Sequence, residues 1–256
     1  MSLHTERLGS GPELVLLHGW GLHAGVWATV VERLAQDYAL TLIDLPGHGR
    51  SRDARITDAQ QVVQQLLEVA PANAVWAGWS LGGMLALRLA ATAPARVKGL
   101  IMVAALPSFV EREDWPFGMR REIFAAFADD LENSFDATLS RFLSLQMRGV
   151  THGRELLRRL REELGRYGEP EPSALRAGLS LLAGEDLRGP LHRLPLPVQM
   201  IMGERDTLVG WQGARQLQQH SAMAVEVIAG AGHAPFLSHP DAFCQAVNRF
   251  TQGLGS

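Results

Sequence analysis

Short apolar runs recur along the chain between glycine, proline and aspartate residues. Such runs are typical of strands that are buried on both faces of a parallel sheet. The predicted strands are Leu14–Leu17, Leu40–Ile43, Ala74–Ala77, Val97–Val103, Val198–Met202 and Val225–Ile228.

Helix-length segments separate several of these runs. We expect helices over Val26–Gln36, Asp58–Val69 and Gly83–Ala93, and a last helix over Ala242–Phe250. Strands that alternate with helices predict the α/β fold class, with a mostly parallel sheet covered by helices on both faces.

The alternation stops between Glu111 and Glu185, where apolar residues follow helical spacing among many charges. The strand pattern resumes after Pro190. We therefore expect residues 1–110 and 186–256 to form one core, with residues 111–185 inserted as a helical cap, or lid. Because clefts in open α/β sheets lie at the carboxyl ends of the strands, a cap there would roof a binding pocket.

The composition is that of an ordinary globular protein, with 46% hydrophobic and 20% charged residues. A formal net charge of -3 gives no overall basic field, so we expect neither nucleic acid nor a membrane as a partner. Cys244 is the single cysteine, and the start of the chain lacks the apolar run of a secretory signal. A cytoplasmic monomer without a transmembrane helix is expected.

Two glycine-rich loops follow predicted strands, at residues 18–21 and 44–51. Neither has the G-x-x-x-x-G-K-[ST] or G-x-G-x-x-G pattern of a nucleotide site. No cluster of residues has the spacing of metal ligands. We therefore expect no cofactor and no metal, and we interpret the second loop as structural.

The chemistry of the chain is indicated first by Gly78-Trp79-Ser80-Leu81-Gly82, which joins a predicted strand directly to a predicted helix. A G-x-S-x-G turn in this context holds a nucleophilic serine in a tight bend, where close backbones leave room only for glycine. Ser80 is therefore the expected nucleophile. The alternative is a serine that caps an ordinary helix.

A serine hydroxyl needs a base, and the base needs a carboxylate to orient it. His233 lies in the loop after the last predicted strand, and Asp206 follows the strand before it. The order serine, aspartate, histidine is that of the α/β-hydrolase fold. Glu204 is the alternative acid, Asp206 alternatively caps the next helix, and His233 is alternatively an exposed loop residue.

A tetrahedral intermediate also needs donors for its oxyanion. The amide of Leu81, at the start of a helix, is one expected donor, and the amide of Trp20 in the first glycine-rich loop is the other. His18 in the same loop is interpreted as a structural hydrogen-bonding residue rather than a catalyst.

A resemblance to a known family extends over nearly the whole chain and is clearest in four segments: Leu14–Leu22, Gly78–Gly83, Arg141–Gln146 and Gly232–Pro240. With them the sequence resembles the BioH family, the pimeloyl-[acyl-carrier protein] methyl ester esterases of biotin synthesis. The resemblance implies hydrolysis of the methyl ester of a pimeloyl chain that is still attached to its acyl-carrier protein.

The resemblance also implies roles for individual residues. Trp20 and Leu81 match oxyanion and substrate-contact positions, and Phe142 and Gln146 match residues of the acyl pocket. The positions that match arginines facing the acidic carrier are Arg141, Arg154 and Arg158. A further arginine of the family falls at Ala137 here, which is a departure from the family pattern at the carrier-docking face.

The charges of the predicted cap are segregated. Residues 141–166 contain seven arginines against three acids, whereas residues 111–136 contain three arginines against eight acids. A local basic face can attract an acidic partner although the whole chain is acidic. The alternative is a solvated helix face with pairs such as Glu155 and Arg159.

Fold and triad do not determine the substrate. One rival function is a broad-specificity short-chain carboxylesterase or lactonase on the same fold. A second is a binding protein that keeps the triad and turns over slowly.

Overall fold

A single twisted sheet organises the part of the chain that the computed structural model describes, residues 2–219 and 223–255. Its strands lie in the order β1-β3-β2-β4-β5-β6-β7. Strands β2 to β7 are parallel, and β1 is antiparallel to its neighbour β3. The strands are β1 Thr5–Leu8, β2 Glu13–Leu17, β3 Ala39–Ile43, β4 Ala74–Trp79, β5 Val97–Val103, β6 Val198–Gly203 and β7 Ala224–Ile228.

The six strands expected from the sequence are present within one or two residues, and β1 is an additional strand. Strand β1 lies at the edge of the sheet, and its four residues are intermediate or exposed. An edge strand that is not buried has no continuous apolar run, so its sequence gives no strand signal.

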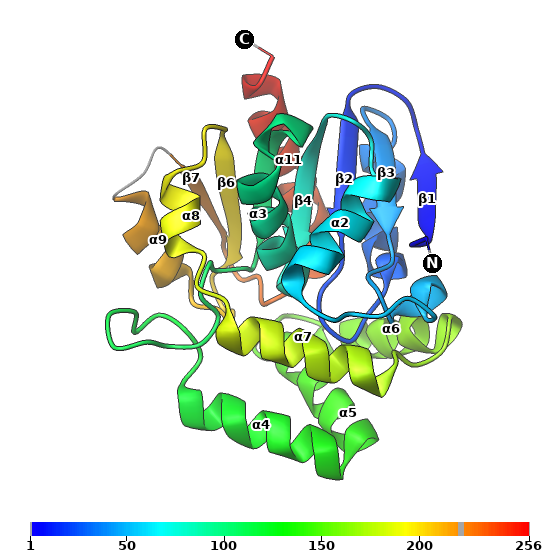
Figure 1. Ribbon diagram of the computed structural model, residues 1–256, viewed down its shortest axis with the longest axis vertical. Helices are drawn as coiled ribbons and strands as arrows, with labels where there is room; N and C mark the ends of the chain where they lie inside the picture. The colour runs from blue at the N-terminus through cyan, green and yellow to red at the C-terminus, as the bar shows by residue number, and fades with distance from the viewer. Residues whose placement is uncertain (1, 220–222, 256) are drawn as a thin grey trace.

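Helices cover both faces of this sheet, as expected (Figure 1). In Figure 1, α2 and α3 lie in front of the sheet and α11 lies behind it. The core helices are α1 Ala28–Leu34, α2 Ala59–Val69, α3 Leu81–Thr92, α8 Arg188–His192, α9 Trp211–Gln218, α10 Pro235–Ser238 and α11 Pro240–Gly253. Three short 3₁₀ helices are Ala24–Trp27, Gly49–Ser51 and Pro94–Arg96.

The alternation of side chains along each strand divides the core into two clusters. Val15 and Leu17 of β2 belong to the cluster on the α2 and α3 face, whereas Leu14 and Leu16 belong to the cluster on the α1 and α11 face. Successive residues of a strand point to opposite faces, so a strand that is apolar throughout contributes to both. The predicted α/β class, with a mostly parallel sheet, is confirmed.

Between β5 and α8 the chain leaves the sheet and forms four helices: α4 Arg121–Asn133, α5 Phe135–Gln146, α6 Gly153–Arg166 and α7 Pro172–Gly184. In Figure 1 these helices lie beyond the carboxyl ends of the parallel strands. Leu160 of α6 joins the core cluster on the α1 and α11 face, and Leu175 of α7 joins the other cluster. The division into core and cap at residues 111–185 stays a prediction.

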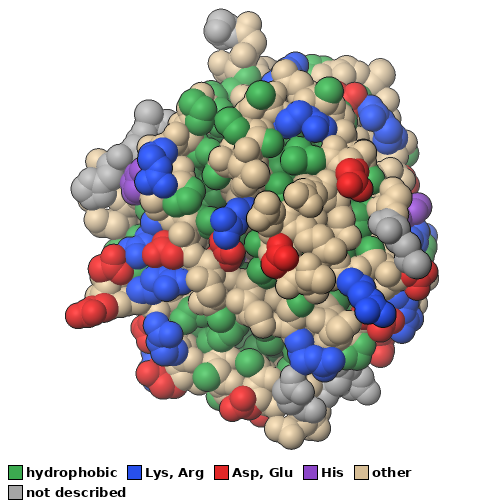
Figure 2. All heavy atoms as spheres, viewed as in Figure 1, with side chains coloured by type: hydrophobic (Ala, Val, Ile, Leu, Met, Phe, Trp, Pro, Cys, Tyr) green, Lys and Arg blue, Asp and Glu red, His purple; other side chains and the backbone are tan. Residues whose placement is uncertain are grey.

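The surface has no dominant charge on the face seen in Figure 1. Figure 2 shows basic and acidic side chains interspersed there rather than gathered into a patch of one sign. Among the helices of residues 2–219 and 223–255, none has the length and apolar character to cross a bilayer.

Candidate active site

Ser80 lies in a strained turn between β4 and α3. Its backbone has φ 54° and ψ -117°, a conformation that costs a residue other than glycine free energy. The turn is so tight that a Cβ on Gly78 would lie 2.2 Å from the carbonyl oxygen of Gly82. The side chain of Ser80 makes no capping hydrogen bond to the helix, so the capping interpretation does not describe it.

His233 and Asp206 form a buried hydrogen-bonded pair. His233 Nδ1 lies 2.8 Å from Asp206 Oδ2, and the side chains are 1% and 0% exposed. His233 is therefore not a solvent-exposed loop residue. With Asp206 as the acceptor, Nδ1 carries the proton of the neutral ring and Nε2 keeps its lone pair. Nε2 is buried and has no hydrogen-bond partner among the described residues.

The two candidate acids have different partners. The second oxygen of Asp206 accepts hydrogen bonds from the amides of Leu208 at 2.8 Å and Val209 at 2.9 Å. Its carboxylate is thus held from both sides while it orients the imidazole. Glu204 instead accepts a hydrogen bond from the Gly230 amide at 2.8 Å.

The nucleophile turn and the histidine loop are linked by Trp79, which directly precedes Ser80. Its indole Nε1 donates a 2.7 Å hydrogen bond to the carbonyl oxygen of His233. The end of β6 also contacts the loop after β7, since a Cβ on Gly203 would lie 2.1 Å from the carbonyl oxygen of Gly232. These contacts gather the loops that carry Ser80, Asp206 and His233 at one edge of the sheet.

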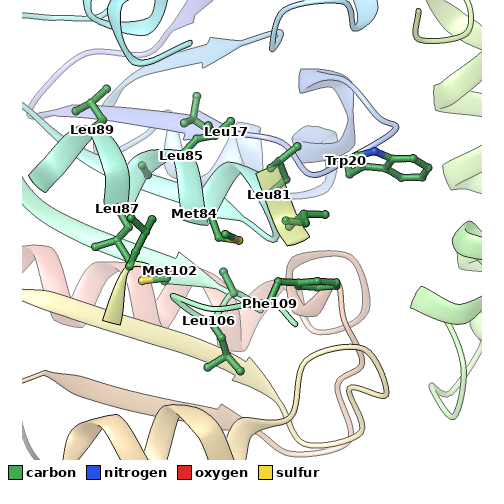
Figure 3. Close-up of a cluster of buried hydrophobic side chains, with 14 of the residues drawn as sticks. Leu17, Trp20, Leu81, Met84, Leu85, Leu87, Leu89, Met102, Leu106 and Phe109 are labelled. Carbon is green, nitrogen blue, oxygen red and sulfur yellow. The ribbon is translucent and has the colours of Figure 1, made fainter. Parts of the chain in front are cut away.

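The expected oxyanion donors come from two loops that touch. A Cβ on Gly82 would lie 2.4 Å from the carbonyl oxygen of His18, so α3 starts directly against the loop after β2. Trp20 and Leu81 lie at this junction, and Figure 3 shows both at the end of the buried cluster that faces the cap helices. Both side chains approach Gly178 of α7, where an added Cβ would lie within 3.2 Å of each.

An apolar cavity of about 370 Å³ lies between this junction and the cap helices. Its volume falls in the range of about 300–1,000 Å³ that is typical of small-molecule sites. Trp20 forms one wall, fixed by a 2.8 Å hydrogen bond from its Nε1 to the carbonyl oxygen of Leu175. The other lining residues are Phe109, Met119, Glu122, Ile123, Phe124, Ala126, Phe127, Asp130, Arg141, Phe142, Leu145, Leu179, Leu182 and Leu208.

The two residues expected in the acyl pocket differ in position. Phe142 lines the cavity, and its ring meets the Trp20 ring edge-on at a centroid distance of 4.9 Å. Gln146 is outside the lining set and is 1% exposed. Both polar atoms of its amide lack a hydrogen-bond partner among the described residues. The backbone of Gln146 adjoins Gly232, next to His233.

The expected carrier-facing arginines lie on two helices. Arg141 on α5 forms an ion pair with Asp130 of α4, and both line the cavity. Arg154 and Arg158 line a separate open groove of about 430 Å³ on α6. Ala137 is exposed on α5. The structure thus groups Arg154 with Arg158 and places Arg141 at the cavity.

Intrahelical pairs also occupy this face of α6. Glu155 pairs with Arg159 at 2.6 Å and Arg158 pairs with Glu162 at 2.5 Å, as the alternative of a solvated helix face requires. Arg161 lines the same groove and donates a 2.7 Å hydrogen bond to Ser140 Oγ of α5. Arg161 therefore links α6 to Ser140, the residue that precedes Arg141 on α5.

Two buried histidines lie behind Trp20. Burial, together with the neighbouring His48, lowers the pKa of His18 to about 3. Burial likewise lowers the pKa of His48 to about 4. Both imidazoles are therefore neutral at the pH at which a histidine base operates. No role for His48 or Trp79 was predicted from the sequence, because Gly21 and His233, to which they bind, lie 27 and 154 positions away.

No group of three or more potential metal-binding side chains occurs within residues 2–219 and 223–255. The reactive groups that the loops bring to the sheet edge are the hydroxyl of Ser80, the imidazole of His233 and the carboxylate of Asp206. This set is suited to acyl transfer through a covalent serine intermediate.

Comparison with known proteins adds sequence and structural relatives. The sequence model of the alpha/beta hydrolase family matches residues 14–246. A pimeloyl-[acyl-carrier protein] methyl ester esterase of Xanthomonas oryzae pv. oryzae (strain MAFF 311018) is 49% identical over 255 residues, which cover 98% of this chain and all of that protein. This confirms the resemblance found in the sequence.

Solved structures confirm the fold. A bromoperoxidase from Bacillus anthracis superimposes with a TM-score of 0.88 at 22% identity, covering 98% of this chain and 95% of that chain. The esterase EaEST from Exiguobacterium antarcticum superimposes with a TM-score of 0.86 at 23% identity, covering 99% and 96%. At these identities the likeness concerns the fold, not the substrate.

Proposed function

We propose, since the chain belongs to the alpha/beta hydrolase family, that it is a serine carboxylesterase acting on the methyl ester of pimeloyl-[acyl-carrier protein]. The products are pimeloyl-[acyl-carrier protein] and methanol, in biotin synthesis. The single observation that carries the chemistry is the buried pair of His233 and Asp206, in which His233 Nε2 has no hydrogen-bond partner in the described part of the chain. The nearly full-length identity to the Xanthomonas esterase supports the substrate.

Ser80 attacks the ester carbonyl while His233 Nε2 accepts the hydroxyl proton. Asp206 holds the ring in the tautomer that leaves Nε2 free and stabilises the imidazolium that forms. The amides of Trp20 and Leu81 donate hydrogen bonds to the tetrahedral oxyanion. His233 then gives its proton to the departing methoxide oxygen, which leaves as methanol.

The acyl-enzyme is released by the reverse sequence of proton transfers. Water loses a proton to His233 Nε2 as its oxygen attacks the acyl carbonyl, and the proton returns to Ser80 Oγ when the acid departs. The pimeloyl chain occupies the apolar cavity, where Trp20 and Phe142 supply its walls. Gln146, whose buried amide lacks a partner among the described residues, contacts the bound ester.

Helices α4–α7 act as the cap over this cavity, and their basic face receives the carrier protein. Arg141 lies at the cavity, and Arg154 and Arg158 lie along the groove on α6. The resemblance implies an acidic carrier protein, so complementary charge steers the encounter. Ala137 offers no charge at its position, so carrier docking depends on the arginines that remain.

Methanol release from the methyl ester of pimeloyl-carrier protein tests this function, with wild type and Ser80→Ala compared beside a short free ester. We expect turnover of both esters by wild type and a loss on the order of 10⁶ in the variant. Cleavage of the free ester alone would retain the esterase and reject the assigned substrate. Rapid acylation without steady turnover would instead favour the binding-protein function.

Carrier docking is tested by the double variant Arg154→Ala/Arg158→Ala, with Arg193→Ala outside the α6 groove as the matched control. We expect a rise in KM for the carrier-bound ester that weakens as salt is added, and no change for the free ester. Equal effects of the double variant and the control would reject a docking face on α6.

A further inference from the structure

The loop that follows β3, residues 44–51, packs against the loop that follows β2, residues 18–24. Asp44 Oδ1 accepts a 2.7 Å hydrogen bond from the Ala24 amide. A Cβ on Gly49 would lie 2.7 Å from the Cβ of His23, so Gly49 packs directly against the His23 side chain. The sequence analysis treated residues 44–51 as structural, and the proposed mechanism does not use them.

His18 lies in the loop after β2 and joins it to the loop after β3. Its Nε2 accepts a 2.8 Å hydrogen bond from the amide of Leu45. The proton of the neutral ring must therefore be on Nδ1, which lies 2.8 Å from the carbonyl oxygen of Gly19 and donates to it.

His48 lies in the loop after β3 and joins it to the loop after β2. Its Nδ1 lies 2.9 Å from the carbonyl oxygen of Pro46, which can only accept, so Nδ1 carries the proton. Its Nε2 accepts from the amide of Gly21 at 3.4 Å. Both His18 and His48 are 0% exposed, and their ring centroids are 5.3 Å apart.

The two histidines hold the peptide groups on either side of Trp20. The Gly19 carbonyl and the Trp20 N–H belong to one planar peptide group, so a bond to that carbonyl fixes the direction of that N–H. The Gly21 N–H belongs to the next peptide group, which contains the Trp20 carbonyl. His18 therefore restrains one side of Trp20, and His48 restrains the other.

Burial keeps this arrangement in one protonation state. Burial lowers the pKa of His48 to about 4. The neighbouring His23 also lowers this pKa, whereas Asp44 raises it. A protonated His48 would direct an N–H toward the N–H of Gly21, and the bond between the loops would be lost.

We propose that His48 is a positioning residue of the esterase reaction, which acts with His18 to aim the Trp20 amide at the oxyanion. The inference rests on the proposed function only in assigning the Trp20 amide to the oxyanion. His48 does not touch substrate. An oxyanion donor stabilises the transition state more than the bound ester, so its misalignment lowers kcat with little effect on KM.

Three substitutions of His48 separate positioning from packing. His48→Gln keeps an acceptor near the place of Nε2, whereas His48→Asn retains only a polar group near Nδ1 and is too short to reach Gly21. His48→Phe fills the volume without an acceptor. His192→Gln, at an exposed histidine on α8, is the matched control.

The experiment measures kcat and KM for a short p-nitrophenyl ester, the inhibition constant of a trifluoromethyl ketone, and the thermal midpoint of each variant. We expect His48→Asn and His48→Phe to lower kcat about 10-fold, less than the loss of a whole oxyanion donor, with KM within about 2-fold of wild type. Affinity for the ketone, whose adduct carries an oxyanion, should fall by the same factor. His48→Gln and His192→Gln should stay within about 3-fold of wild type.

Wild-type kcat in folded His48→Asn would overturn the proposal, as would an equal loss in His48→Asn and His48→Gln. If His48→Phe fails to fold, the comparison of the Asn and Gln variants still decides. Failure of the wild type to hydrolyse the ester would reject the proposed function instead. The two failures are therefore distinguishable in one set of assays.

Discussion

Trp79 Nε1 donates a 2.7 Å hydrogen bond to the carbonyl oxygen of His233, so the residue before the nucleophile holds the backbone of the base. The two residues are 154 positions apart in the sequence. Their rings also lie close, with centroids 5.6 Å apart. The position of His233 relative to Ser80 therefore depends on an indole that touches neither the substrate nor Asp206 in the proposed mechanism.

Replacing Trp79 by Phe should lower kcat about 10-fold, because the loop that carries His233 loses its hydrogen bond. The free energy of unfolding should fall by about 1 kcal/mol for the lost bond, with a further cost for the smaller ring. Kinetics on a short free ester and urea denaturation measure the two effects.

Trp76→Phe is the matched control for this variant. Trp76 lies on the same strand and is fully buried, and its Nε1 has no hydrogen-bond partner within the described residues. We expect a comparable packing cost and an unchanged kcat. A kcat loss as large in Trp76→Phe would show that the effect of Trp79 comes from packing of the strand.

Replacing Asp206 by Asn should lower kcat by about 10⁴, because an amide would stabilise the wrong tautomer of His233. Glu204→Gln is the control, since Glu204 binds the Gly230 amide rather than the histidine. It should lower kcat by less than about 3-fold. If Glu204→Gln is the more damaging change, the assignment of the acid is wrong.

The stability of the protein should decrease as pH falls from about 6.5 toward 4. The folded-state pKa of His48 is about 4, below its value of 6.5 in the unfolded chain, so in this interval the unfolded state binds more protons. The contribution of neutral His48 to the free energy of unfolding is complete above pH 6.5, and about 2 kcal/mol of it should be lost by pH 5. His18, with a pKa of about 3, acts in the same direction.

Denaturation curves of wild type and His48→Phe at several pH values measure this effect. The variant lacks the imidazole of His48, whose pKa burial lowers, so its free energy of unfolding should depend less steeply on pH. Parallel pH profiles for the two proteins would show that His48 takes up its proton equally well in the folded and unfolded states.

Replacing Asp130 by Asn should lower KM for the carrier-bound ester by about 2- to 5-fold, because Arg141 no longer has an intramolecular partner. The carboxylate of Asp130 competes with an acidic carrier for the same guanidinium. The factor is small because both side chains are about half exposed, so solvent screens their attraction. Kinetics with the carrier-bound ester and with a short free ester measure the effect.

Asp129→Asn is the control for the change in total charge. It removes the same charge from the same helix and leaves the pair of Asp130 and Arg141 in place. An equal decrease in KM for the two variants would mean that only the overall charge of α4 matters. No decrease in either would contradict the role of Arg141 in carrier binding.

Local sequence was sufficient for the elements whose signal lies in consecutive residues. Buried strands are apolar throughout, so six strands were found from the sequence, and the half-exposed edge strand β1 was missed. The turn around Ser80 was recognised because its glycines are required by contacts within five residues of chain, such as that of Gly78 with Gly82. The order of strands and helices predicted the α/β class, and the order of Ser80, Asp206 and His233 indicated the α/β-hydrolase fold.

The candidate acid and base could be located by a general rule. The carboxyl ends of parallel strands share one edge of the sheet, so loops after β6 and β7 had to approach the loop after β4. That rule places Asp206 and His233 near each other without giving a distance. Their catalytic roles stay predictions that the variants test.

The sequence by itself determined the strand pattern, the serine turn and the set of candidate reactive groups, because each depends on neighbouring residues or on element order. Only the tertiary structure decided which partners they have. The bonds of His48 to Gly21, of Trp79 to His233 and of Arg141 to Asp130 depend on how separate loops and helices meet. A hydrogen bond requires its donor and acceptor atoms to lie within about 3 to 3.5 Å, and spacing along the chain does not determine distances of that size across a folded core.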